Sequence, residues 1–151
     1  MKIIIGSDHA GYELKERIKE YLHGLGFEYE DVGPESLDPS DDYPDYIISA
    51  AKKVAENLEE NKGIVIGGSG QGEAIAANKV KGIRAVVYYG GSLDIVKFSR
   101  THNDANVLSL GARFLSEVEA KNAVKLWLET PFSGNERHIR RGKKIKEFED
   151  K

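Results

Sequence analysis

One glycine-rich stretch holds the residues of this 151-residue chain that are best suited to chemistry. Residues 67–73 are Gly-Gly-Ser-Gly-Gln-Gly-Glu, after the apolar run 63–66 and before a helix-like run that begins at Ala74. A loop with so few side chains can bend sharply and turn its backbone N–H groups toward an anion beside a helix N-terminus. The hydroxyl of Ser69 and the carboxyl of Glu73 could carry protons. The pattern also fits a tight turn in which Glu73 only stabilises the first turn of a helix.

The glycine pattern does not match two common phosphate-binding motifs. It lacks the Lys-Ser/Thr pair of a P-loop, and its spacing is G-x-G-x-G rather than the G-x-G-x-x-G of dinucleotide-binding proteins. No acidic residue ends the next predicted strand, where a ribose hydroxyl would be bound. Dinucleotide binding is therefore disfavoured.

Two further polar loops contribute candidate residues. Asp8 and His9 follow the first apolar run, and His102 and Asn103 lie in the polar stretch 101–105. Carboxylate and imidazole groups are common acid–base catalysts. Asp8 could instead be the N-cap of the helix that follows it, and an isolated histidine is more often structural than catalytic.

The C-terminal segment is basic and contains two arginines with helical spacing. Arg137 and Arg141 are four residues apart, so a helix would place both on one face, where they could bind a phosphate or carboxylate bidentately. The alternative is a solvated basic helix whose apolar residues, Ile139, Ile145 and Phe148, pack inward. Nucleic-acid binding is a weaker alternative, because no basic domain or aromatic RNA-binding motif accompanies the segment.

The composition narrows the class of protein. The length suits one domain with a real core, and a net charge of −3 gives no reason to expect nucleic acid as a partner. The lack of cysteine excludes disulfides, thiolate nucleophiles and cysteine-based zinc sites. The acids of loop 34–45 lack calcium-site spacing, and we expect a solvated loop there. No apolar run is long enough to span a membrane, so we expect a cytoplasmic protein.

Apolar patterning predicts the elements that position these residues. Continuous β-branched runs indicate buried strands, and apolar residues three or four apart indicate amphipathic helices. The predicted strands cover residues 2–5, 27–32, 63–66, 84–88 and 106–110. The predicted helices cover about 14–25, 47–58, 74–79, 93–100, 116–129 and 135–149. The alternation predicts an α/β fold: a single domain, 1–151, with a doubly wound, Rossmann-like, five-stranded parallel sheet and helices on both faces.

The predicted sheet offers one edge for a binding site. In open α/β sheets, ligands bind outside the carboxyl ends of the strands. We place four polar loops at that edge, namely residues 6–11, 33–45, 67–73 and 101–105. Their polar side chains would then share one site.

Five motifs together resemble those of the ribose-5-phosphate isomerase type B family, within the wider group that includes galactose-6-phosphate isomerase subunits. They follow the family's order from the first strand to the last helix, and five in sequence are highly specific although each alone is not. The motifs are Ser7-Asp8-His9-Ala10-Gly11, Asp42-Tyr43-Pro44-Asp45-Tyr46, residues 67–79, residues 100–108 and Arg137-His138-Ile139-Arg140-Arg141.

The resemblance implies interconversion of an aldose phosphate and a ketose phosphate through an enediolate, without a metal or an organic cofactor. Many family members carry a cysteine base where this chain has Gly68, whereas a second branch has Gly-Gly-Ser-Gly with a glutamate further along. The chain matches the second branch, which implies that Glu73 is the base and that Ser69 passes protons between O1 and O2. The backbone donors that would stabilise the enediolate belong to Gly70, Gln71, Gly72 and Glu73.

The resemblance also implies roles for the other loops. Asp8 and His102 would open the furanose ring, Tyr43 and Asn103 would hold sugar hydroxyls, and Gly68 would also bind the substrate. The phosphate would be bound by Arg137, Arg141, His9 and, from a neighbouring subunit, Arg113. A homodimer, or a tetramer made of two dimers, would share its active sites between subunits.

Ribose 5-phosphate and ribulose 5-phosphate are the leading substrate pair, which would place the enzyme in the pentose phosphate pathway. The same chemistry on allose 6-phosphate, galactose 6-phosphate or a tetrose phosphate is an alternative, because the phosphate clamp is common to all of them. A non-catalytic phosphate- or nucleotide-binding module on this fold is a third alternative, which uses only the glycine loop and the basic helix.

Overall fold

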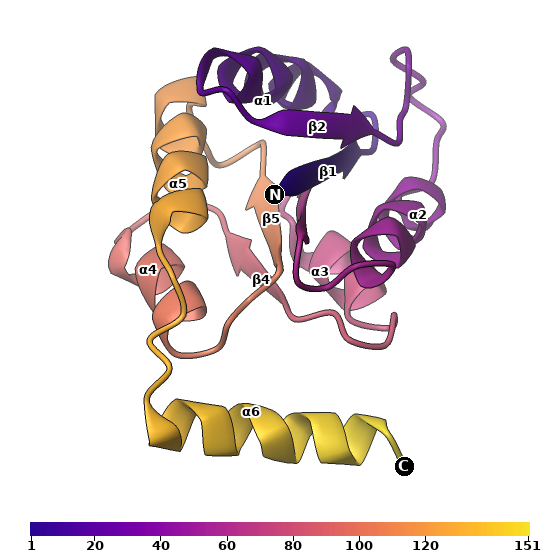
Figure 1. Ribbon diagram of the computed structural model, residues 1–151. Coiled ribbons are helices and arrows are strands. Elements are labelled where there is room, and N and C mark those ends of the chain that lie inside the picture. Colours follow the sequence, from indigo (N-terminus) through magenta and orange to yellow (C-terminus); the bar gives the residue numbers. More distant parts are fainter.

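The computed structural model describes all 151 residues and shows a parallel sheet of five strands flanked by helices (Figure 1). The strands are β1 (Lys2–Ser7), β2 (Glu28–Asp31), β3 (Asn61–Gly67), β4 (Ala85–Tyr88) and β5 (Val107–Gly111). The helices are α1 (Tyr12–Gly24), α2 (Tyr43–Ala55), α3 (Gln71–Ala77), α4 (Asp94–Thr101), α5 (Glu117–Glu129) and α6 (Glu136–Glu149). The predicted α/β fold with five parallel strands is confirmed, and its strand order is β2-β1-β3-β5-β4.

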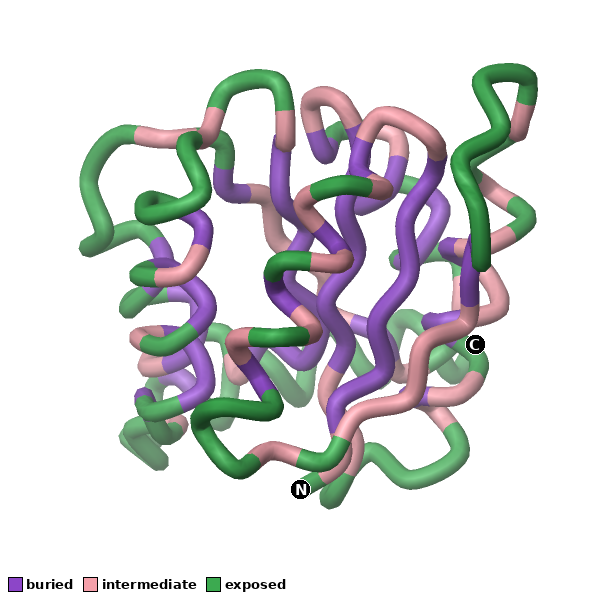
Figure 2. The backbone as a smooth tube through the Cα atoms, turned by 90° about the horizontal axis from the view of Figure 1, so that it is seen from above, coloured by how far each residue is buried: buried purple, intermediate pink, exposed green.

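The central strands β1, β3 and β5 form the buried middle of the protein (Figure 2). Ile5 of β1 pairs in register with Ile64 of β3, which pairs with Leu108 of β5, and all three side chains are fully buried. Continuous apolar runs suit a parallel sheet because helices cover both of its faces. The edge strand β2 is only partly buried and carries acidic side chains, which an edge tolerates.

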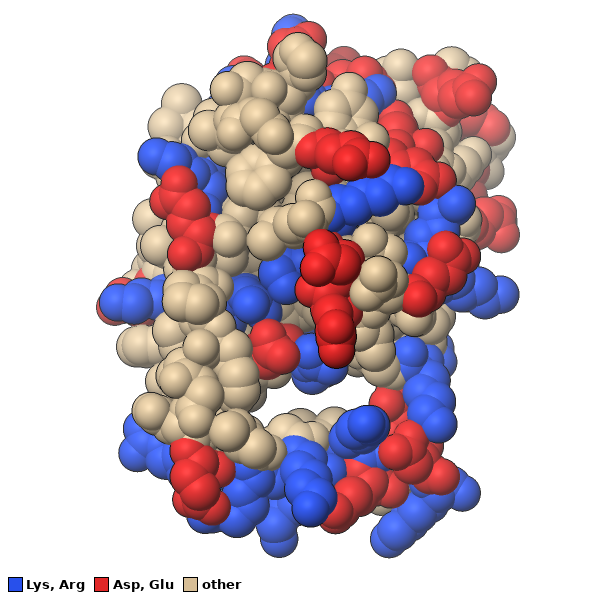
Figure 3. All heavy atoms as spheres, viewed as in Figure 1, with Lys and Arg blue, Asp and Glu red and all other residues tan.

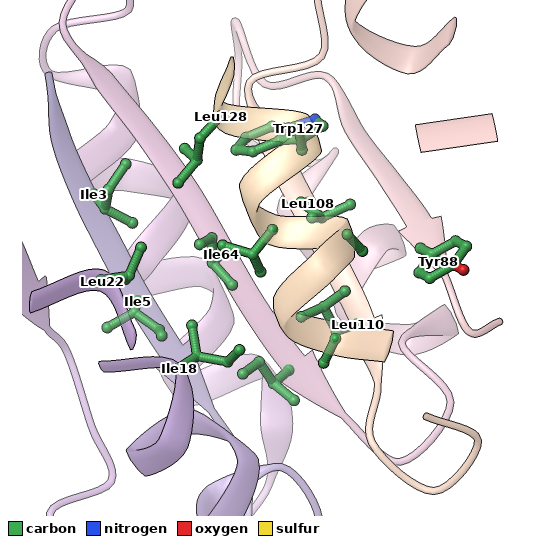
Figure 4. Close-up of a cluster of buried hydrophobic side chains, with 14 of the residues drawn as sticks. Ile3, Ile5, Ile18, Leu22, Ile64, Tyr88, Leu108, Leu110, Trp127 and Leu128 are labelled. Atoms are coloured by element: carbon green, nitrogen blue, oxygen red, sulfur yellow. The ribbon is translucent and has the colours of Figure 1, made fainter. Parts of the chain in front are cut away.

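Two apolar clusters attach the helices to the sheet, one on each face. The larger packs α1, α4 and α5 against the sheet and includes the fully buried Trp127 (Figure 4). The smaller packs α2 and α3 against the opposite face. Helix α5 begins with a capping box: Ser116 Oγ accepts a hydrogen bond from the Glu119 backbone N–H, and the Glu119 carboxylate accepts one from the Ser116 backbone N–H, both at 3.1 Å.

Helix α6 stands apart from these layers, on the side of the sheet where the strands begin (Figure 1). A hydrogen bond attaches the chain to the rest of the domain just before the helix, where the Ser133 N–H donates to the Thr101 carbonyl at 3.2 Å. The chain is attached again at the far end, where the Glu149 carboxylate accepts from the Gly82 N–H at 3.0 and 3.1 Å. Between these points a cleft of about 710 Å³ separates α6 from the body (Figure 3).

The apolar side chains of α6 lack a core to pack on. Ile139, Ile145 and Phe148 are 52%, 62% and 78% exposed, and the two isoleucines line the cleft. The alternative in which these residues pack inward is therefore wrong for a single chain. None of the helices combines the length and the apolar character needed to cross a membrane.

Candidate active site

The glycine loop joins β3 to α3 at the carboxyl edge of the sheet. Gly70, the N-cap of α3, has φ +79°, a left-handed conformation that L side chains rarely adopt. Its carbonyl accepts a hydrogen bond from the Ser109 hydroxyl of β5 at 2.7 Å, which holds the loop against the neighbouring strand. The Ser69 hydroxyl accepts a hydrogen bond from the Gln71 N–H at 3.3 Å. The loop is thus a fixed turn that keeps a hydroxyl at the start of a helix.

Glu73 is the buried carboxyl of this site. It is only 4% exposed, and it lies against Gly67 so closely that a Cβ there would come within 2.5 Å of Oε2, the more distant carboxylate oxygen. Burial raises the pKa of Glu73; the backbone N–H groups of Glu73 and Gly70 oppose the rise, and the charge of Asp8 adds to it. Burial therefore outweighs the helix N-terminus, and a carboxylate of raised pKa is a stronger general base.

Two side chains from other segments close around the glycine loop. Tyr43, at the start of α2, lies against Gly72, since a Cβ there would be 2.7 Å from its Cζ. Arg113, just after β5, lies over Gly68, with guanidinium atoms 3.1 to 3.3 Å from the position of a Cβ. The backbone N–H of Arg113 also donates to the Gly68 carbonyl at 3.0 Å. Arg113 therefore reaches the loop of its own chain, and the expectation that it comes from a neighbouring subunit is wrong.

Asp8 and His9 lie between β1 and α1, at the same edge of the sheet. Asp8 is 7% exposed, and its Oδ1 accepts a hydrogen bond from the Gly11 N–H at 3.1 Å. The N-cap of α1 is Gly11 itself, so Asp8 supports the turn before the helix and the alternative that makes it the N-cap is wrong. His9 is paired with Asp41 through Nδ1 and Oδ1, which are 2.7 Å apart.

Asp41 is the site residue that the sequence did not reveal. Its loop was expected to be solvated, but its side chain is only 4% exposed, whereas Asp38 and Asp42 are exposed. No local pattern distinguishes these three acids, because the partner of Asp41 lies 32 residues away. Ligand atoms of Asp8, His9 and Asp41 lie within 4.8 Å of one another, but the His9 Nδ1 is already bonded to Asp41. The metal-free site stays a prediction.

His102, Asn103, Arg137 and Arg141 lie at the opposite edge of the sheet, where the strands begin. Residues 101–105 precede β5 rather than follow it, so they emerge at its amino end. The five residues of β5, at roughly 3.3 Å each, put about 16 Å between that end and the glycine loop. The expectation that loop 101–105 shares an edge with the glycine loop of the same chain is therefore wrong.

These residues of the amino edge form a basic and aromatic cluster. The His102 ring stacks on Phe98 with centroids 4.8 Å apart and lies 4.4 Å from the His138 ring. Burial lowers the pKa of His138, and the charges of His102, Arg137 and Arg141 lower it further. Both arginines are exposed, and neither forms a salt bridge. Arg137 Nε donates to His138 Nε2 at 3.3 Å, which leaves the outer guanidinium nitrogens of this arginine, and the guanidinium of Arg141, available to bind an anion.

Comparisons with known proteins agree on one family. The family model described as Ribose/Galactose Isomerase matches residues 3–145. The putative sugar phosphate isomerase YwlF of Bacillus subtilis is 42% identical over 151 residues, which are 100% of this chain and 99% of that protein. Ribose-5-phosphate isomerase B of Mycobacterium tuberculosis is 42% identical over 149 residues, 99% of this chain and 90% of that one. The crystal structure of ribose-5-phosphate isomerase B from Mycoplasma genitalium with bound ribulose-5-phosphate matches with a TM-score of 0.95 at 41% identity, covering 99% of this chain and 97% of that chain.

Proposed function

The chain belongs to the ribose/galactose isomerase family, and we propose that it interconverts ribose 5-phosphate and ribulose 5-phosphate, a reaction of the pentose phosphate pathway. The observation that carries the proposal is Glu73, a buried carboxyl of raised pKa in the glycine loop. An aldose–ketose isomerisation needs one base that moves a proton between C2 and C1 of the open-chain sugar. The ribulose-5-phosphate bound to the Mycoplasma genitalium enzyme supports this substrate pair.

The mechanism uses the loop's two reactive side chains in turn. The Glu73 carboxylate removes the proton from C2 of the open-chain aldose, and the electrons of the C–H bond move onto the carbonyl to form an enediolate. The protonated Glu73 then returns the proton to C1, while Ser69 moves a proton between O1 and O2. Asp8, buried nearby, assists the opening of the furanose ring. Backbone N–H groups of the loop stabilise the charge of the enediolate.

We extend the proposal to a homodimer, because the carboxyl edge of one chain is an incomplete site. It offers two basic side chains for a phosphate, His9 and Arg113. A second copy would add the four side chains of the amino edge, which are His102, Asn103, Arg137 and Arg141. The exposed apolar residues of α6 and the cleft beside it support such an association, because exposed apolar patches mark contact surfaces. A tetramer and a cytoplasmic location stay predictions.

The assigned base is tested by Glu73→Gln, which keeps the shape of the side chain and removes its basicity. In a coupled assay of ribulose 5-phosphate formation, we expect kcat to fall by about 10²- to 10⁴-fold. Glu59→Gln, on the exposed surface, is the matched control and should keep the wild-type rate. Near-normal turnover of folded Glu73→Gln would refute the assignment. The same assay with a chelator should show an unchanged wild-type rate if the reaction needs no metal.

The shared site is tested by mixing two inactive variants, Glu73→Gln and Arg137→Ala, after reversible dissociation. In a mixed dimer, one site combines the intact Glu73 of one chain with the intact Arg137 of the other. Random pairing should therefore restore about a quarter of the wild-type sites. If both residues served a site within one chain, the mixture would show no activity beyond the sum of its parts.

A second candidate keeps the chemistry and changes the sugar. The family description names both ribose and galactose, and the proposed clamp for the phosphate does not depend on the rest of the sugar. A panel of aldose phosphates, compared by kcat/KM, separates the candidates, because specificity is the ratio of these values. A higher kcat/KM for allose 6-phosphate, galactose 6-phosphate or a tetrose phosphate would replace ribose 5-phosphate as the substrate.

A further inference from the structure

Building on the proposed isomerase function, we propose that Asp41 is a positioning residue, which holds the His9 ring by Nδ1–H, favours the positive charge of that ring and leaves Nε2–H free to donate to the substrate phosphate. Two hydrogen bonds carry the inference. Asp41 Oδ1 accepts from the His9 backbone N–H at 3.0 Å and is 2.7 Å from the His9 Nδ1. One oxygen thus holds both the backbone and the ring of the same residue, which fixes the direction of the imidazole.

The pairing sets which nitrogen of His9 carries a proton. An ionised carboxylate can only accept, so Nδ1 must be the donor in this hydrogen bond. Nε2 lies on the other side of the ring, makes no hydrogen bond within the chain, and belongs to a side chain that is 31% exposed. The side chain of Asp41 is only 4% exposed, so the acid is buried while the His9 imidazole remains accessible to a ligand.

The charges around His9 favour its imidazolium form. The hydrogen bond with Asp41 raises the pKa of His9; burial opposes this rise, the charges of Asp8 and Asp41 add to it, and Arg113 lowers it. Hydrogen bonds from Ser40 lower the pKa of the exposed Asp38, burial opposes this, and the charge of His9 lowers it slightly further. When His9 is protonated, its charge lies close enough to the Arg113 guanidinium for the two to interact. Two adjacent cations suit a phosphate dianion better than one, because hydrogen bonds from charged donors are the stronger ones.

A purely structural role for Asp41 fits less well. Its second oxygen, Oδ2, is buried without any hydrogen-bond partner, although buried polar atoms of proteins nearly always have one. An uncharged side chain in this loop would avoid that desolvation. The carboxylate of Asp41 therefore carries an unfavourable desolvation energy. Its contribution is to orient the His9 ring and to stabilise the positive charge of that ring.

The test is Asp41→Asn, because the amide oxygen can still accept both hydrogen bonds while the negative charge is lost. The control is Asp42→Asn, which removes the charge of the adjacent exposed acid that makes no contact with His9. First, NMR titration of the ring of His9, assigned with His9→Gln, reports its pKa without any substrate. We expect the pKa of His9 to fall in Asp41→Asn and to stay unchanged in Asp42→Asn. An unchanged pKa in Asp41→Asn would overturn the proposal.

Kinetics then show whether the lost charge matters for the phosphate. At a pH between the two pKa values of His9 measured by NMR, where only the wild type keeps the imidazolium, we expect KM for ribose 5-phosphate to be about 10-fold higher in Asp41→Asn, with kcat changed less than about 3-fold. Below both pKa values the imidazolium is present in both proteins, and the two KM values should converge. In a His9→Gln background, adding Asp41→Asn should leave KM unchanged. A rise that is independent of pH, or that persists without His9, would indicate a structural role and overturn the proposal.

The outcome does not depend on the identity of the sugar. If the protein does not turn over ribose 5-phosphate, titration with inorganic phosphate replaces the assay, and the shift of the His9 ring signal reports binding. We expect weaker binding to Asp41→Asn than to wild type at a pH between the two pKa values of His9, and equal binding at a pH below both. Equal binding at both pH values would refute the role of Asp41, whereas failed turnover with intact phosphate binding would refute only the proposed reaction.

Discussion

A single methyl group at Gly67 would test whether Glu73 acts from its packed position. A Cβ there would lie 2.5 Å from Oε2 of Glu73 and closer still to the rest of the carboxylate. Ordinary van der Waals contact begins at 3.4 Å, so in Gly67→Ala the carboxylate must move by at least 0.9 Å. A misplacement of about 1 Å can cost on the order of 10²-fold in rate. We therefore expect kcat of Gly67→Ala to fall about 100-fold, which corresponds to about 2.7 kcal/mol.

The measurement of kcat for Gly67→Ala is combined with a measurement of its thermal unfolding. The overlapping atoms belong to the end of a flexible side chain, so thermal unfolding should show that Gly67→Ala remains folded. Gly24→Ala is the control, because nothing lies within 4 Å of a Cβ at that position. Glu73→Asp provides a second test, because its shorter side chain relieves the overlap with the added methyl group. The double variant Gly67→Ala/Glu73→Asp should therefore lose less kcat than the product of the two single fold-losses. Wild-type kcat in folded Gly67→Ala would refute the reasoning.

Three further predictions concern pH and stability. The raised pKa of Glu73 places the acid limb of the kcat/KM profile above pH 4.5, because protonation removes the base as the pH falls through that pKa; a limb at or below 4.5 would contradict the effect of burial. Ser116→Ala should lower the free energy of unfolding by about 1 kcal/mol in a urea titration and leave kcat unchanged, since it removes only a helix cap. Lys15→Met should lower that free energy by about 3 kcal/mol, because Asp31 loses the fully buried ammonium 2.8 Å away; an unchanged midpoint would show that Lys19 suffices for Asp31.

Chain order alone was enough to bring part of the site together. Asp8, His9, Ser69 and Glu73 all follow strands of a parallel sheet, and such strands end at one common edge. Once the alternation of strands and helices is recognised from apolar patterning, this shared edge follows without coordinates. The same rule, applied correctly, places residues 101–105 at the other edge, because they precede β5. The sequence thus contained the information that separates His102 from Glu73.

The tertiary structure alone decided the environment of each group. Glu73 has a helix N-terminus, which lowers a carboxyl pKa, and a buried position, which raises it, and only packing against Gly67 shows that burial prevails. Asp41 resembles its acidic neighbours in the sequence, and only the path of the loop past His9 distinguishes it. The order of strands and loops can be read from the sequence, and in a parallel sheet this order decides at which edge each loop lies. Burial and hydrogen-bond partners depend instead on segments that are far apart in the chain. The sequence therefore determined the fold and the set of reactive groups, and packing determined which of them is a strong base and which of them holds another in place.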